Sequence, residues 1–131
     1  MSIFIISTLC RQHEMTQPPT AHSTRMEISD IYVHDAQLHR VIEDIEKQTV
    51  TFEVDLPILE RGEEQEPRLL VFDDAYNYQV FEQPWHGLVT ILDMHVVGES
   101  GRIRQVRIET NAGYRELFCS GVRVIEYDHV A

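Results

Sequence analysis

The sequence TVTFEVDL, residues 49–56, decides the fold class. Its apolar residues occupy every second position, with threonine or an acidic residue between them. A period of two is that of a β-strand with one buried face and one solvated face. Pro57 ends the pattern, because proline cannot donate a backbone hydrogen bond to a neighbouring strand.

The segment before this strand has two interpretations. In DAQLHRVIEDIEKQ, residues 35–48, the spacing i, i+3, i+4, i+7 is that of an amphipathic helix capped by Asp35, and it is formed by Leu38, Val41, Ile42 and Ile45. The alternative is a strand through Ile42 with a bulge, followed by a turn at 44–48 and a hairpin into TVTFEVDL. Periodicity alone favours the helix, whereas the family resemblance given below favours the hairpin. We prefer the hairpin, and the helix stays open at this point.

The rest of the chain is typical of further strands separated by turns. A charged loop is expected over 60–68, and strands over 69–72, 76–81, 88–97, 102–110, 114–119 and 122–127. Short glycine-bearing turns between the last strands are typical of an antiparallel meander. We therefore expect a mainly β fold, an antiparallel meander of about seven strands forming a curved sheet, small barrel or sandwich, with at most one short helix.

The first 25 residues differ in character from the remainder of the chain. Residues 3–10, IFIISTLC, are apolar but too short to span a bilayer, and the next residues are polar and contain Pro18-Pro19. We expect residues 1–25 to be a flexible or non-native segment and residues 26–131 to be a single β-rich domain.

The net charge and the two cysteines indicate which classes of partner and which cellular setting to expect. The chain has 131 residues, with 11 basic and 22 acidic side chains and a net charge of −11. Such a field repels phosphate backbones and anionic bilayers, so we expect no nucleic acid and no membrane partner. Cys10 and Cys119 form no disulfide framework, and we interpret them as thiols in a reducing, cytoplasmic setting, with Cys119 as a small buried residue.

Asp93 and His95 are the candidate metal ligands. Two residues apart on one strand, they project from the same face, where a carboxylate and an imidazole can share an ion. No fixed spacing supplies a third ligand, and the candidates by elimination are His34, His39 and His86. The competing interpretation is a hydrogen-bonded pair with no metal, and no cofactor is predicted.

The candidate partner-binding residues lie in the middle of the chain. Acidic residues would steer a basic partner toward aromatic contact residues. The set for contact and steering is Asp73, Asp74, Tyr76, Tyr78 and Trp85, with Glu63, Glu64 and Glu66 as further steering acids. The competing interpretations are bend-forming acids and a small aromatic core. No nucleophile motif or phosphate-binding glycine loop is present, so no catalytic residue is assigned and an enzyme is not the preferred interpretation.

Two stretches carry a family resemblance. VHDAQLHRVIEDIEKQTVTFEVDL, residues 33–56, resembles the opening of small uncharacterised bacterial β-rich domains, which begin with His-Asp-(Ser/Ala)-x-Leu and continue into a β-hairpin. RLLVFDDAYNYQVF, residues 68–81, is similar to their next strand. Some of these domains look like immunity proteins, which neutralise toxins by binding them. The resemblance implies a bacterial binding protein and supplies no catalytic residue.

These observations lead to two functional hypotheses. The first is an acidic protein-binding module, either an immunity-like inhibitor of a basic protein or a homo-oligomeric scaffold, most simply a homodimer. The second is a metal or small-ligand binding domain, enzymatic or not, centred on Asp93 and His95.

Overall fold

The computed structural model describes residues 22–57 and 64–126. These residues form one antiparallel sheet of nine strands and a single 3-10 turn. The elements are β1 His22–Met26, η1 Ile28–Asp30, β2 Ala36–Asp44, β3 Thr49–Pro57, β4 Gln65–Asp73, β5 Tyr76–Glu82, β6 Val89–Ser100, β7 Ile103–Thr110, β8 Gly113–Cys119 and β9 Gly121–Glu126.

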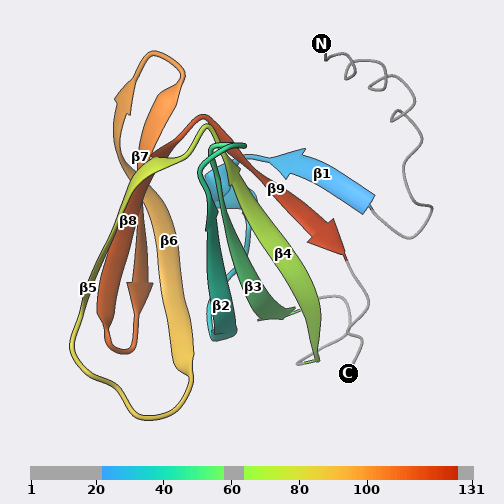
Figure 1. The fold of residues 1–131 in the computed structure, drawn as a ribbon. Helices are drawn as coiled ribbons and strands as arrows, with labels where there is room; N and C mark the ends of the chain where they lie inside the picture. The colour runs from blue at the N-terminus through green and yellow to red at the C-terminus, as the bar shows by residue number, and fades with distance from the viewer. Residues whose placement is uncertain (1–21, 58–63, 127–131) are drawn as a thin grey trace.

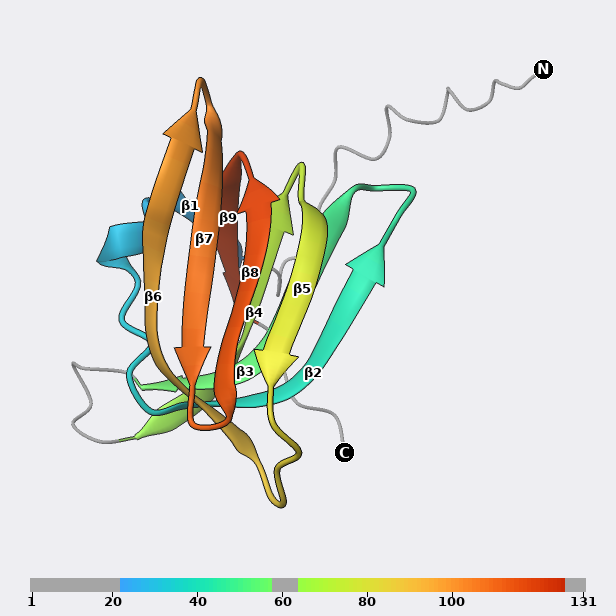
Figure 2. The same cartoon turned by 90° about the vertical axis from the view of Figure 1, so that its left-hand side faces the viewer.

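The sheet is strongly curved and consists of two halves (Figures 1 and 2). The strand order is β1-β9-β4-β3-β2-β6-β7-β8-β5, so the end strands β1 and β5 do not pair and the sheet is not closed. One half contains β1 to β4 with β9, and the other contains β5 to β8. The halves are joined by a seam in which only residues 36–38 of β2 pair with residues 89–91 of β6. The expected mainly β, curved antiparallel fold is confirmed.

The core lies on the concave side and draws on both halves. In β3 the buried residues alternate with half-exposed ones along the whole strand, as its sequence predicts. The rings of Phe52 and Phe72 meet edge to face at 5.3 Å, and Tyr78 from the other half packs on Phe52 at 6.0 Å. Fully buried side chains from β7 and β8, Val106, Ile108 and Leu117, complete the contact. Because each half covers the apolar face of the other, the sheet needs no helical layer.

The hairpin interpretation of residues 36–48 is confirmed, and the helical one is wrong. β2 pairs with β3 along its length, with a register shift between Leu38 and Arg40. The extra residue in this bulge places Leu38 and Val41 on the same, core-facing side although they are three residues apart. A bulged strand therefore reproduces part of the spacing of an amphipathic helix.

Three boundaries differ from the expected ones. There are nine strands rather than about seven, and the first begins at His22, before the expected domain start at Met26. Residues 65–68 belong to β4 and not to a charged loop. Pro67 is opposite Asp55 of β3, and β9 pairs with β4 only from Arg68 onward, so Pro67 lies where β4 has a neighbouring strand on one side alone.

The third difference concerns the β6–β7 hairpin. β6 continues to Ser100, where a turn was expected from residue 98, and the reversal occurs at Gly101 and Arg102. Gly101 has φ of +63°, which the first central residue of such a two-residue hairpin loop requires. Within the described ranges, no helix has the length and apolar character needed to cross a bilayer.

Candidate functional site

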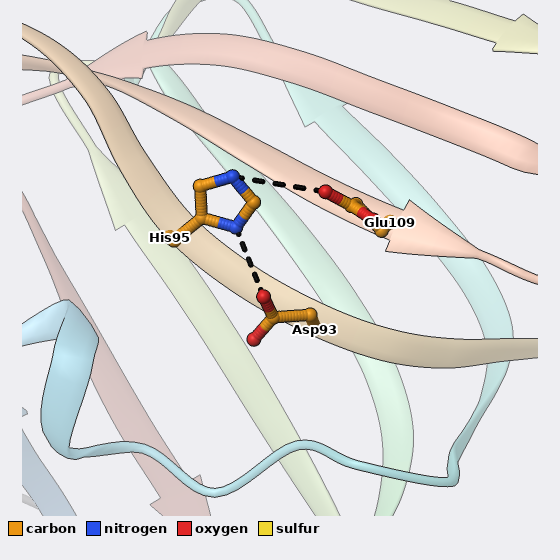
Figure 3. Close-up of side chains that lie close together, drawn as sticks. All are labelled: Asp93, His95 and Glu109. Carbon is orange, nitrogen blue, oxygen red and sulfur yellow. Dashed lines mark hydrogen bonds and ion pairs between the residues drawn. The ribbon is translucent and has the colours of Figure 1, made fainter.

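Asp93, His95 and Glu109 form a cluster on the outer face of the β6–β7 hairpin (Figure 3). Nδ1 of His95 lies 3.1 Å from Oδ2 of Asp93, and Nε2 lies 3.7 Å from Oε2 of Glu109. One ligand atom from each residue can be chosen so that all three lie within 4.8 Å of one another. The imidazole is therefore held between two carboxylates that come from neighbouring strands.

The register of the hairpin produces this arrangement. Asp93 is directly opposite Glu109, and His95 is two residues further along β6. A register shift between Ile91 and Asp93 precedes the cluster, and Met94 between the two ligand candidates points into the core. The inward side chain anchors the strand while its neighbours face the solvent.

In the part of the chain that the structure describes, none of the three candidate histidines lies close enough to join Asp93 and His95 in one group of possible ligands. Nδ1 of His34 is 3.0 Å from the carbonyl oxygen of Leu92, and Nε2 of His39 is 2.7 Å from Asp55. His86 is exposed in the connection between β5 and β6. Among the described residues, Glu109 is the side chain that joins Asp93 and His95. The expected turn at residues 98–101 would place Val106 opposite Asp93, so the sequence carried no signal for Glu109. The later reversal and the register shift between Val96 and Gly98 bring Glu109 there.

Asp73 and Asp74 are both engaged in ion pairs. Asp73 accepts two hydrogen bonds from the guanidinium of Arg123, at 2.7 and 2.9 Å, and these bonds raise the pKa of the arginine. Asp74 lies 3.3 Å from Arg102 and accepts a hydrogen bond from Ser120. Much of the negative charge expected to steer a partner is thus compensated within the chain.

The other expected steering acids are dispersed. Glu66 accepts a hydrogen bond from Arg68 at 3.0 Å, and Glu64 is exposed before β4. Glu63 and Cys10 lie outside the described residues. Cys119 is fully buried, as expected for a small core residue.

The aromatic residues of β5 separate into two groups. On the outer face Tyr76 stacks on Phe118 at 5.2 Å, and Phe81 stacks on Tyr114 at 4.9 Å. We call these four side chains the aromatic patch. The guanidinium of Arg107 lies 4.5 Å from the centre of the Tyr114 ring. Trp85 is exposed in the connection between β5 and β6.

Tyr78 instead faces the interior, beside a shielded ion pair. Arg115 donates from Nε and Nη2 to the carboxylate of Glu82 at 2.6 and 2.8 Å, and from Nη1 to the Tyr78 hydroxyl at 2.7 Å. Thr110 donates a further hydrogen bond to Glu82 at 3.0 Å. The side chains of Arg115 and Glu82 are only 13% and 9% exposed.

These contacts shift the pKa values of Glu82 and Tyr78. Burial opposes the charged form of Glu82, but the hydrogen bonds from Arg115 and Thr110 outweigh it, and its pKa lies below the usual value. Burial raises the pKa of Tyr78, and the positive charge of Arg115 offsets only part of that effect. Tyr78, predicted as a contact residue, is thus partly buried against the core.

Comparison with known proteins identifies no relative: no family model matches the chain, and no curated protein or solved structure gives a significant match. The resemblance to bacterial β-rich, immunity-like domains stays a prediction.

Proposed function

We propose that this chain is a protein-binding module that uses the aromatic patch and the edge of β5, and that its partner is a second copy of the chain. The observation that carries the proposal is the gathering of exposed aromatic side chains on the last strand of the sheet. Tyr76 and Phe81, which are 54% and 45% exposed, lie on β5, and β5 pairs with β8 alone among the described strands. Tyrosine, phenylalanine and arginine are enriched at the centres of protein interfaces.

The edge itself supports strand pairing. Residues 76–81 contain no charged side chain and no proline, two of the devices that protect an edge strand from association. A bulge near Asn77 leaves residues 79–82 as the regular part of the edge. A short antiparallel contact between two copies, widened by the aromatic patch, fits a two-fold symmetric dimer.

The local charge favours a second copy over a basic protein. Arg107 and Glu116 beside the patch form an ion pair of 2.6 Å, so they add no net charge to it. Asp73 and Asp74, near the start of β5, are paired with arginines. Two patches can therefore meet without strong like-charge repulsion, despite the net charge of −11 of each chain.

The test is sedimentation velocity of the full chain over a concentration series. We expect a dimer that dissociates on dilution, and at least a tenfold weaker association for Tyr76→Lys and for Phe81→Lys. Ile42→Lys is the matched control, because Ile42 is 40% exposed and lies on β2 in the other half of the sheet. Circular dichroism of each variant confirms that it is folded.

Two outcomes would contradict the proposal. One is a wild-type chain that stays monomeric up to about 1 mM, since an association weaker than that is worth less than about 4 kcal/mol. The other is an Ile42→Lys variant that dissociates as readily as Tyr76→Lys, which would assign the effect to added charge and not to the patch.

A further inference from the structure

The cluster of Asp93, His95 and Glu109 has a geometry that suits a metal ion and is separate from the surface proposed for protein binding. Ligands bound about 2.1 Å from a tetrahedral Zn²⁺ ion lie roughly 3.4 Å from each other. The 3.7 Å between Nε2 of His95 and Oε2 of Glu109 is close to that spacing. A small rotation of the half-exposed Glu109 side chain is enough to let both atoms contact one ion.

Asp93 occupies the position of a supporting residue for the same ion. Histidines that bind metals almost always donate the N–H of the other ring nitrogen to a carboxylate or carbonyl oxygen, which fixes the tautomer and the ring plane. Nδ1 of His95 is 3.1 Å from Oδ2 of Asp93, a hydrogen-bond distance. With the proton on Nδ1, the lone pair of Nε2 is directed toward Glu109 (Figure 3).

The charge of the cluster also attracts a cation. Asp93 and Glu109 carry two negative charges, and within the described part of the chain no lysine or arginine forms an ion pair with either. Arg107 is opposite His95 in the register, but its guanidinium is bound to Glu116 at 2.6 Å and lies over the Tyr114 ring. The charge of Glu109 still acts on this guanidinium at longer range, so Arg107 offsets part of the negative charge of the cluster.

The backbone holds the ligands in place. All three residues lie within paired segments of β6 and β7, with the buried side chains of Met94 and Ile108 directly opposite each other on the inner face. A ligand set on rigid strands loses little conformational freedom when it binds an ion.

We propose that His95 and Glu109 bind a divalent transition-metal ion such as Zn²⁺, with His95 coordinating through Nε2 and Asp93 orienting the ring through Nδ1. Two protein ligands leave coordination positions for water or for a donor from a small molecule.

The experiment is titration of the untagged full chain with Zn²⁺ by calorimetry, and with Co²⁺ followed by its visible absorption. We expect one saturable site that is lost in His95→Ala, and at least tenfold weaker binding in Glu109→Gln. Asp93→Asn is expected to keep the stoichiometry and to weaken binding 10- to 100-fold, the usual effect of removing a supporting carboxylate. His86→Ala is the matched control, since His86 is an exposed histidine outside the cluster.

Nitrogen NMR of the histidine rings separates the two coordination modes. We expect the Nε2 resonance of His95 to shift to the metal-bound range on addition of Zn²⁺, with Nδ1 still protonated. Binding that persists in His95→Ala would overturn the proposal, as would metal coordination through Nδ1 or an Asp93→Asn variant with unchanged affinity. Thermal unfolding of the variants without metal verifies that each retains the fold.

Discussion

Replacing Glu82 by glutamine is expected to destabilise the protein strongly, because it leaves a shielded guanidinium without its counter-charge. Glu82 accepts two hydrogen bonds from Arg115 and one from Thr110. Glutamine keeps one acceptor oxygen, while its amide nitrogen presents a donor to the donors of Arg115. At least one charge-assisted bond is lost, worth about 1.5–3 kcal/mol.

The uncompensated charge adds to that loss. Removing one partner of a buried ion pair costs about 3–5 kcal/mol in total. We expect a decrease of this size in the free energy of unfolding, which is a large share of the roughly 5–15 kcal/mol of a typical domain. The measurement is urea unfolding followed by far-ultraviolet circular dichroism at neutral pH.

Glu53→Gln is the matched control. Glu53 also pairs with an arginine across neighbouring strands, with 2.6 Å between Arg40 Nη2 and Glu53 Oε2, but the Arg40 side chain is 65% exposed. A pair of this kind is worth up to about 1 kcal/mol. Equal losses for Glu82→Gln and Glu53→Gln, both below about 1 kcal/mol, would refute the reasoning that burial makes the Glu82 pair critical.

The same pair also makes stability depend on pH. Because the pKa of Glu82 is lower in the folded state, the unfolded state takes up the proton first as the solution is acidified. Its contribution is complete above the ordinary glutamate pKa of about 4.3 and is lost as the pH falls through the folded value. The stability difference between wild type and Glu82→Gln should therefore decrease below about pH 4. A difference that is constant down to about pH 3 would contradict this account.

Three further substitutions test other parts of the fold. Tyr78→Phe removes the hydroxyl that accepts a hydrogen bond from Arg115 and should lower the free energy of unfolding by about 1 kcal/mol. Since the pKa of Tyr78 is raised in the folded state, the wild type should also lose stability as the pH rises above about 10, and urea unfolding should show a smaller loss in Tyr78→Phe. Gly113→Ala should cost more than about 1 kcal/mol in chemical unfolding, because Gly113 has φ of +152° and a Cβ atom there would overlap the carbonyl oxygen of Phe81. Leu117→Ala should cost about 2–5 kcal/mol, seen as a lower thermal midpoint, because Leu117 is fully buried, and an unchanged midpoint would mean that the core is not packed as described.

Strands with strict alternation could be predicted from the sequence. One buried face requires an apolar residue at every second position, as at Val50 and Phe52 of β3. The bulge in β2 could only be proposed as an alternative. It shifts the alternation by one residue and brings Leu38 and Val41 to the same side, which is also what a helix does. Local sequence does not distinguish the two cases, since the deciding contact is with β3.

Only the part of the candidate site that lies on one strand could be predicted from the sequence. Asp93 and His95 lie on one strand, so their spacing alone places them on one face. Glu109 comes from the neighbouring strand, and its place depends on the register of the β6–β7 hairpin, which extends further than its glycines suggest. The pairing of Asp73 and Asp74 with Arg123 and Arg102 depends on still longer connections and has no local signal.

The position of β9 between β1 and β4 has a consequence for how the chain folds. Strands β5 to β8 are contiguous in sequence and can pair as soon as residues 76–119 have been synthesised. The other half stays incomplete until residues 121–126 arrive, because β9 is the strand that pairs with β1 and that covers the second edge of β4. Contacts between strands this far apart in sequence close slowly, so the late strand should limit the folding rate. A nascent chain that stops before Val122 would expose the β4 edge, and it is at this stage that the protein would be most open to mispairing with another chain.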